Sequence, residues 1–347
     1  MRCTDNKTKR RRISKRQKRR RALIRSMTRI LMILCFVLLC CIYYKYSNKE
    51  QYFAKKYEVE NYNTSYHKEN LFASELCVVN SSEDKTLSNL SQVKAYGLFD
   101  VDNQNASYAS RIHEKIYPAS TTKILTALVA LENADLSDEV SVSKNACSTS
   151  FAWDEQTCGI KEGDTLTMES LLYGLLLYSG NDTAVAIAEH VGGSVEAFAE
   201  MMNQKANELM ATNSHFTNPS GLYDDEHYTT SYYLYLIFNE CIKHEEFVTM
   251  INADKYTTEI KGADSTIRTT LTWEPTNYYA LGEAEGPEHV EIIGGKTGTL
   301  IAAGNCLILL VEDNKDHPYI SIVMGADSKD LLYQDMTSVL SQIPKNN

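Results

Sequence analysis

The stretch YPASTTKILTALVALENAD, residues 117–135, places a serine three positions before a lysine and continues as an apolar run with helical spacing. Residues three apart on a helix share one face, so Ser120 and Lys123 are expected within reach of each other. A serine hydroxyl becomes a nucleophile when a base removes its proton, and a lysine kept neutral by burial or by a nearby cation can be that base. The stretch is therefore either a serine nucleophile with its base or two polar residues that open a helix.

The Ser-x-x-Lys spacing alone decides little, because the chain contains it five times. The pairs are Ser65/Lys68, Ser82/Lys85, Ser91/Lys94, Ser120/Lys123 and Ser141/Lys144. Two later triplets favour Ser120: Ser179-Gly180-Asn181, at the break between two helical patterns, and Lys296-Thr297-Gly298, on or beside a strand. From average residue usage, each triplet is expected in fewer than about one chain in ten of this length. Their joint presence indicates a catalytic set.

The hydrophobic periodicity predicts strands at both ends of the folded part and helices between them. A hairpin is expected over 93–112, with its turn at 102–105, and three strands over 289–295, 305–313 and 319–326. Helices are expected over 120–134, 168–177, 182–191, 195–209, 230–243 and 331–343. This order predicts an α+β fold, in which one antiparallel sheet joins strands from the two ends, helices flank it, and a helical subdomain is inserted.

With the flanking sequences PASTTKILTAL, NPSGL and GGKTGTLIAAGNCL, the three motifs resemble those of the serine-type D-Ala-D-Ala carboxypeptidases. These are the low-molecular-mass penicillin-binding proteins of peptidase family S11, and the resemblance covers residues 71–345. It implies the β-lactamase/transpeptidase-like fold, removal of the terminal D-Ala from peptidoglycan pentapeptide stems through a serine acyl-enzyme, and acylation by β-lactams. It implies no cofactor. Gly180 in the second triplet favours this family over class A β-lactamases.

The resemblance also implies roles in acylation. Ser120 would attack the penultimate D-Ala carbonyl, and Lys123 would be its base, kept neutral by burial and by the neighbouring cation Lys296. Ser179 would relay a proton between Lys123 and the leaving amine, and Asn181 would bond the substrate amide.

The third motif would bind substrate. Gly298 would let the peptide approach the strand edge, and the amides of Ser120 and Thr299 would form an oxyanion hole. The family's arginine for the terminal carboxylate is absent, because Leu332 stands before Tyr333. The carboxylate would then depend on Lys296 and on the Thr297 and Thr299 hydroxyls, which predicts a relaxed demand for a free C-terminus.

The N-terminal sequence predicts a membrane anchor. Residues 1–29 carry 14 Lys or Arg and one acid, and residues 30–44, ILMILCFVLLCCIYY, carry no charge. The positive-inside rule then predicts a cytoplasmic basic arm (1–29), an uncleaved transmembrane segment (30–44), an extracytoplasmic stalk (45–70) and an extracytoplasmic catalytic domain (71–347) at the cell membrane. A basic arm followed directly by an uncharged apolar segment favours a role in orienting the chain in the membrane over nucleic-acid binding.

Metal and cysteine chemistry have little support. The eight histidines include no H-E-x-x-H, and no Cys/His spacing suggests zinc. His215 and His227 are expected to order a loop near the site. Cys147 and Cys158 either pair or are buried as small apolar residues.

Two alternatives to a carboxypeptidase stay open. A β-lactamase needs a carboxylate to activate the deacylating water, and no Glu-x-x-x-Asn lies between Asn181 and Lys296. A non-catalytic sensor of β-lactams or cell wall is disfavoured by the complete triplets.

Overall fold

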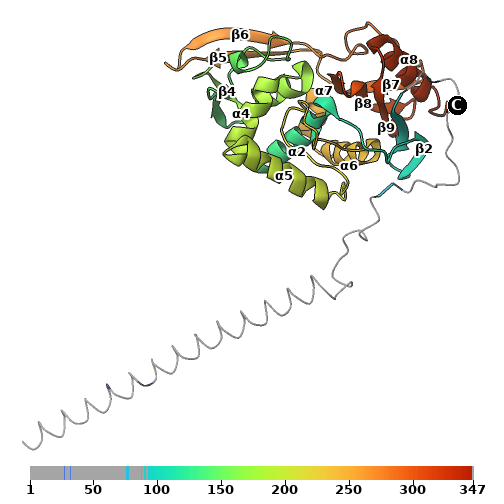
Figure 1. The fold of residues 1–347 in the computed structure, drawn as a ribbon, viewed down its shortest axis with the longest axis horizontal. Helices are drawn as coiled ribbons and strands as arrows, with labels where there is room; N and C mark the ends of the chain where they lie inside the picture. The colour runs from blue at the N-terminus through green and yellow to red at the C-terminus, as the bar shows by residue number, and fades with distance from the viewer. Residues whose placement is uncertain are drawn as a thin grey trace, which may run out of the picture. The chain divides into compact units, whose positions relative to one another are not determined.

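The computed structural model describes residues 93–345, together with Met27, Met32, Leu76, Cys77, Leu87 and Leu90. The described helices and strands belong to one compact unit, Leu76–Asn347 (Figure 1). Apart from Met27 and Met32, the basic arm, transmembrane segment and stalk lie outside the described residues. In the described part of the chain, no helix has the length and apolarity needed to cross a membrane.

A five-stranded antiparallel sheet joins the two ends of the unit, as the sequence predicted. Its order is β2-β1-β9-β8-β7. The strands are β1 (Ala95–Asp100), β2 (Asn105–Ser110), β7 (Val290–Leu300), β8 (Gly304–Asp313) and β9 (Pro318–Ala326). Ala95 pairs with Met324, so the first strand lies beside the last one. The third motif extends β7 beyond its predicted end, and β7 forms an edge of the sheet.

The predicted helices are present with small shifts of their ends. They are α2 (Lys123–Asn133), α3 (Met168–Tyr173), α4 (Asn181–Gly192), α5 (Val195–Glu208), α6 (Ser231–Cys241) and α8 (Lys329–Leu340). A 3₁₀ turn, η1 (Ala119–Thr122), precedes α2, and a π-helical turn, η3 (Gly174–Tyr178), follows α3. Another short 3₁₀ turn is η2 (Ser148–Ser150), and α7 (Glu245–Ile251) was not predicted.

The inserted subdomain is more than helical, which corrects the prediction. A second antiparallel sheet has the order β3-β4-β5-β6. Its strands are β3 (Glu139–Ser141), β4 (Thr165–Thr167), β5 (Tyr256–Lys261) and β6 (Ile267–Trp273). It packs against the helices through aromatic rings: Tyr173 of α3 stacks on Tyr256 of β5, with the ring centroids 3.8 Å apart.

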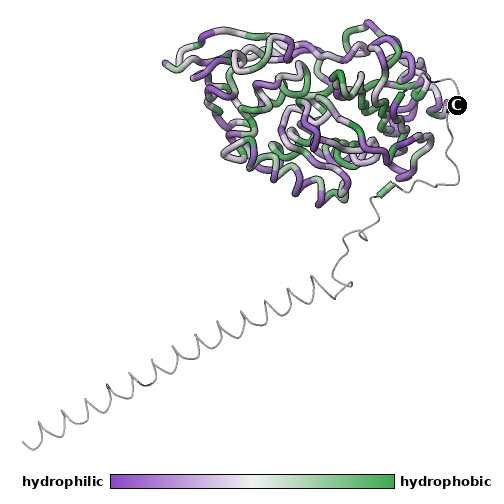
Figure 2. The backbone as a smooth tube through the Cα atoms, in the orientation of Figure 1, coloured by the Kyte–Doolittle hydropathy of each residue, from purple (hydrophilic) through white to green (hydrophobic). Residues whose placement is uncertain are grey.

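The five-stranded sheet is buried on both faces, and β8 shows why. Its alternate residues Ile308 and Leu310 join one apolar cluster, while Leu307, Leu309 and Val311 join another, because successive side chains of a strand point to opposite faces. The first face packs toward α2 and α6, and α8 covers the second. Apolar stretches accordingly run through the interior of the unit, and hydrophilic ones lie mainly in its loops and outer helices (Figure 2).

The cysteines of this unit are unpaired. Cys77, Cys147, Cys158, Cys241 and Cys306 are all free and buried. The prediction that they fill space as small apolar residues is confirmed, and the suggested Cys147–Cys158 bridge was wrong.

Candidate active site

The serine–lysine pair sits on the 3₁₀ turn that leads into α2. In such a turn the side chains at i and i+3 lie one above the other, which is the spacing of Ser120 and Lys123. Lys123 Nζ donates to Ser120 Oγ over 3.0 Å. Ala119, just before the serine, has φ +49°, a conformation that costs a non-glycine residue energy and is typical of functional sites.

Lys123 is fully buried, and its nitrogen makes three hydrogen bonds. Besides Ser120, the acceptors are Asn181 Oδ1 at 2.8 Å and the Ser220 carbonyl oxygen at 2.7 Å. Burial lowers the pKa of Lys123 to about 7, against the opposing effects of Cys158 and Asp182. A lysine with this pKa is a base near neutral pH.

The pKa of Lys123 was expected to be lowered partly by Lys296, and here the structure differs. Burial is what lowers it, since the neighbouring charges that act on it are negative. The repulsion between the two lysines acts on Lys296 instead. Its pKa is lowered well below the usual value, by burial first and by Lys123 second.

The second motif lies where η3 ends and α4 begins. Ser179 has φ +67° and ψ +34°, a left-handed conformation that ends the π-helical turn. The Asn181 side-chain oxygen accepts from Lys123 Nζ, and the bond of Asn181 to the substrate amide stays a prediction. The Ser179 hydroxyl accepts from Lys296 Nζ over 2.8 Å, and its role as a proton relay between Lys123 and the leaving amine also stays a prediction. In this structure Asn181 positions Lys123, and Ser179 links the second and third motifs.

Asp182 holds the second motif in place, a role that was not predicted from the sequence. Its buried carboxylate accepts hydrogen bonds from the amides of Cys158 (2.8 Å), Gly159 (3.0 Å), Ile160 (3.3 Å) and Thr183 (2.9 Å). Burial raises its pKa despite these bonds. Asp182 thus ties the loop before β4 to the start of α4.

The third motif brings β7 against the serine turn. A Cβ at Gly298 would lie 3.1 Å from the Pro118 oxygen and from the nitrogens of Ser120 and Thr121, so only glycine allows this approach without displacement. The Thr297 hydroxyl lies 2.6 Å from that of Thr276. Thr299 Oγ1 donates to Asn305 Oδ1 over 3.1 Å.

The NPSGL loop, residues 218–222, forms another wall of the site. The sequence did not predict that its Ser220 carbonyl accepts a hydrogen bond from Lys123. Gly221 has φ +84°, and a Cβ there would lie 1.9 Å from the Ala119 oxygen. His227 supports the turn, because its Nε2 lies 2.9 Å from Thr122 Oγ1 and its Nδ1 accepts from the Thr217 amide over 3.1 Å. Burial lowers the pKa of His227 to about 4, so it stays neutral. His215 contacts the same loop through the Glu226 carbonyl, as expected of a loop-ordering residue.

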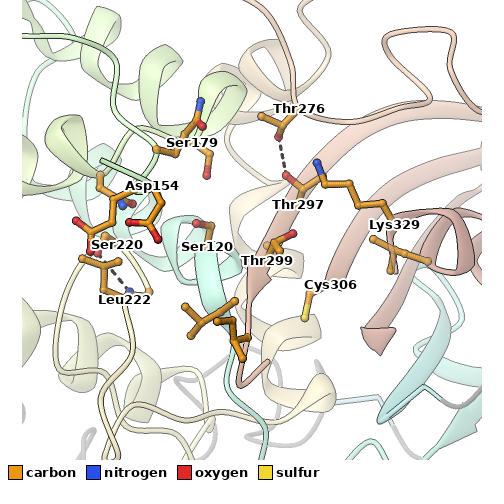
Figure 3. Close-up of a pocket in the computed structure, with 18 of the residues that line it drawn as sticks. Ser120, Asp154, Ser179, Ser220, Leu222, Thr276, Thr297, Thr299, Cys306 and Lys329 are labelled. Carbon is orange, nitrogen blue, oxygen red and sulfur yellow. Dashed lines mark hydrogen bonds between the residues drawn. The ribbon is translucent and has the colours of Figure 1, made fainter. Parts of the chain in front are cut away.

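A cleft of about 620 Å³ contains all three motifs. Ser120, Ser179, Thr297 and Thr299 all point into it (Figure 3). Asp154 lies on the Ser220 and Leu222 side, and Lys329 extends from the opposite side. Two of the five Ser-x-x-Lys pairs, Ser120/Lys123 and Ser141/Lys144, lie wholly within the described residues, and of these two only Lys123 bonds the serine of its own pair.

Ser120, the buried Lys123 and the β7 edge thus lie together as the three motifs predicted. The model described as D-alanyl-D-alanine carboxypeptidase, peptidase family S11, matches residues 82–328. The chain belongs to this family.

Curated S11 relatives agree with this assignment. The D-alanyl-D-alanine carboxypeptidase of Streptomyces sp. strain K15 is 31% identical over 226 residues, covering 62% of this chain and 76% of its own. DacF of Bacillus subtilis is 35% identical over 159 residues, 44% of this chain and 40% of its own. DacD of Escherichia coli is 30% identical over 239 residues, 67% of this chain and 58% of its own. The match thus spans about half the length of the last two.

Solved structures show the same fold. The crystal structure of the Streptomyces K15 DD-transpeptidase aligns with a TM-score of 0.67 and 27% identity, covering 73% of this chain and 98% of that one. DacD of Francisella tularensis, at 22% identity and a TM-score of 0.63, shares the fold over 76% of this chain and 72% of its own. The fold is therefore shared over about three quarters of this chain.

Proposed function

We propose that this S11 protein removes the terminal D-Ala from peptidoglycan stem peptides through an ester on Ser120. The observation that carries the proposal is the 3.0 Å hydrogen bond from Lys123 Nζ to Ser120 Oγ, made by a lysine whose pKa burial lowers to about 7. A nucleophile beside a base of matched pKa is the arrangement that acyl transfer requires.

In the acylation step, neutral Lys123 takes the Ser120 proton while Oγ attacks the carbonyl carbon of the penultimate D-Ala. The carbonyl oxygen becomes negative and is stabilised by the amides of Ser120 and Thr299, each donor contributing about 3–4 kcal/mol in known enzymes. The C–N bond then breaks. The proton held by Lys123 passes to the leaving nitrogen, with the Ser179 hydroxyl as the relay, and D-Ala departs as the free amine.

In deacylation, water attacks the ester carbonyl and Lys123 takes the water proton. The bond between the carbonyl carbon and Ser120 Oγ then breaks, Lys123 gives the proton to Oγ, and the shortened peptide leaves as the free acid. A β-lactam presents the same carbonyl to Ser120, but its leaving nitrogen stays tethered after the ring opens. β-Lactams are thus proposed to acylate Ser120 by the same attack, and the tethered leaving group is the reason why the ester persists.

Substrate binding is proposed to occur along β7. Because β7 is the last strand of the sheet order, its outer edge can pair with an extended peptide. Gly298 keeps that edge close to Ser120. A peptide added there brings its scissile carbonyl to the serine.

The test compares two serines that share the same local spacing. Ser120→Ala should abolish both labelling by a fluorescent penicillin and D-Ala release from a pentapeptide. Ser141→Ala is the matched control, because Ser141 also precedes a lysine by three but is exposed on β3. Labelling that survives in Ser120→Ala would overturn the assignment of the nucleophile.

The same assay separates the two alternatives. Steady D-Ala release supports a carboxypeptidase, whereas one stoichiometric acylation without release indicates a sensor. Penicillin turnover at a rate similar to that of peptide turnover indicates a β-lactamase. Intact mass followed over time after benzylpenicillin distinguishes these outcomes.

We further propose, from the sequence of residues 1–70 alone, that the chain crosses the cell membrane once at 30–44, with the basic arm cytoplasmic and the catalytic domain outside. Protease added to intact cells should cut within 45–70 and spare the arm. A soluble form that begins near Lys45 would contradict an uncleaved anchor.

A further inference from the structure

The first turn of α8 forms one wall of the catalytic cleft. Ser328 caps the helix by accepting from the Leu331 amide, and α8 begins at Lys329. Lys329, Leu332 and Tyr333 all line the cleft. Lys329 and Leu332 are three residues apart and so share a helix face. Leu332 is buried and apolar, and Tyr333 is uncharged, which leaves Lys329 as the charged group of this wall.

Positive charge is scarce in the rest of the cleft. Lys123 already donates to three acceptors, which is the whole capacity of an ammonium group. Lys296 donates to Ser179 Oγ at 2.8 Å and to the Thr297 carbonyl at 2.9 Å. Burial opposes a charge on both of these lysines. The other charged residues that line the cleft, Asp154 and Glu155, are acidic.

Lys329 differs from the buried lysines in environment and in partners. It is exposed, so burial does not oppose its charge. Within the described part of the chain no carboxylate forms an ion pair with it, and its ammonium lies 5.5 Å from the centroid of the Tyr278 ring. Tyr278 stacks on Tyr333, with the centroids 4.6 Å apart, and the two rings make a fixed support for the cation.

The cleft also carries hydroxyl groups. Thr276 and Thr297 line the same cleft as Lys329, and their hydroxyls lie 2.6 Å apart (Figure 3). Thr299 of β7 adds a third hydroxyl. An exposed cation and several hydroxyl groups in one cleft are the groups that bind a carboxylate.

We infer that Lys329 binds the C-terminal carboxylate of the substrate, together with the hydroxyls of Thr297 and Thr299. The inference rests on the proposed function, and it names a specificity residue one helical turn before Leu332. A single ammonium is a point charge without the fixed fork of a guanidinium, so it retains a preference for a free C-terminus but a smaller one. Because Lys329 is exposed, this preference should also weaken as salt is added.

The experiment measures kcat/KM for a peptide ending in D-Ala-D-Ala as the acid and as the C-terminal amide. Lys329→Ala should lower kcat/KM for the acid by about tenfold or more and that for the amide by less than about threefold, as expected from losing one hydrogen bond to a charged group. Lys329→Arg should keep the preference. Lys255→Ala, which removes an exposed lysine near β5, is the control for net charge.

A binding measurement keeps the inference testable without turnover. In Ser120→Ala protein, the Kd ratio of amide to acid should fall when Lys329→Ala is added. A fall in kcat/KM that is equal for acid and amide, or no change in the Kd ratio, would overturn the inference. If wild-type protein fails to form the Ser120 adduct while the Kd ratio still depends on Lys329, the proposed function fails and the carboxylate site stands.

Discussion

The two walls of the cleft hold lysines in opposite environments. On the helical wall Lys123 is fully buried and bonded to three fixed acceptors. On the α8 wall Lys329 is exposed, and an aromatic ring supports it. A buried lysine loses its charge readily and can move protons, whereas an exposed one keeps its charge and can hold an anion. Burial alone can therefore give the same side chain two functions in one cleft.

The largest effect should come from removing the base. Lys123→Arg keeps a cation but cannot lose a proton near neutral pH, so acylation by benzylpenicillin should fall by about a thousandfold. Lys144→Arg, in the unused Ser141/Lys144 pair, should acylate normally. If the arginine variant only raised KM for the peptide, Lys123 would be a binding residue and the contrast between the walls would be lost.

A smaller loss of acylation rate should follow from displacing the turn that carries Ser120. Gly221→Ala adds a Cβ 1.9 Å from the Ala119 oxygen, so the turn must move. A shift of about 1 Å at a reacting group costs about a hundredfold in rate. Gly193→Ala is the control, since that glycine also has a positive φ (+77°) but has open space around it. Both variants should lose thermal stability, and only the first should lose acylation.

The dependence on pH should follow Lys123. Only its neutral form is a base, so acylation should rise as pH increases through about 7 and then level off. At pH 6 the rate should be about a tenth of the plateau. Asp182 raises the pKa of Lys123, so Asp182→Asn should move this rise to lower pH, while Asp254→Asn should not. A profile that is flat between pH 5 and 9 would contradict the assignment of Lys123 as the base.

The smallest effect should come from a second cation on the α8 wall. Leu332→Arg places a guanidinium beside Lys329, and its paired hydrogen bonds should raise the acid-over-amide preference by about threefold. Leu332→Met serves as the control for changes of size. Unchanged selectivity with intact acylation would show that position 332 does not reach the substrate carboxylate.

The sequence predicted the main sheet largely because its three central strands, β1, β8 and β9, are buried on both faces. Segments such as 305–313 are almost continuously apolar and cannot be read as surface loops. The second sheet escaped prediction for the opposite reason. Tyr256–Lys261 and Ile267–Trp273 carry mostly polar residues, so their alternation is weak, and pairing between distant segments is what makes them strands.

The three motifs could be found in the sequence because each needs particular residue types at fixed spacing. The groups that orient the motif residues could not be found in this way. Lys123 is held by the backbone carbonyl of Ser220, and any residue could supply a carbonyl there. Asp182 acts on amides of a loop more than twenty positions earlier, and Lys329 reaches the cleft only because α8 packs on the sheet. Such contacts depend on tertiary structure.

The pairing of β1 with β9 determines when the catalytic sheet can be completed. Every residue of β1 is buried, yet its partner on one side lies near the other end of the chain. During synthesis β1 and its hairpin partner β2 emerge first and wait for nearly all of the remaining residues. Contacts between such distant segments close slowly, and an unpaired apolar strand is prone to pair wrongly in the meantime. The sheet therefore cannot be completed before its last strand is made, and a chain truncated before β9 leaves β1 without its central neighbour.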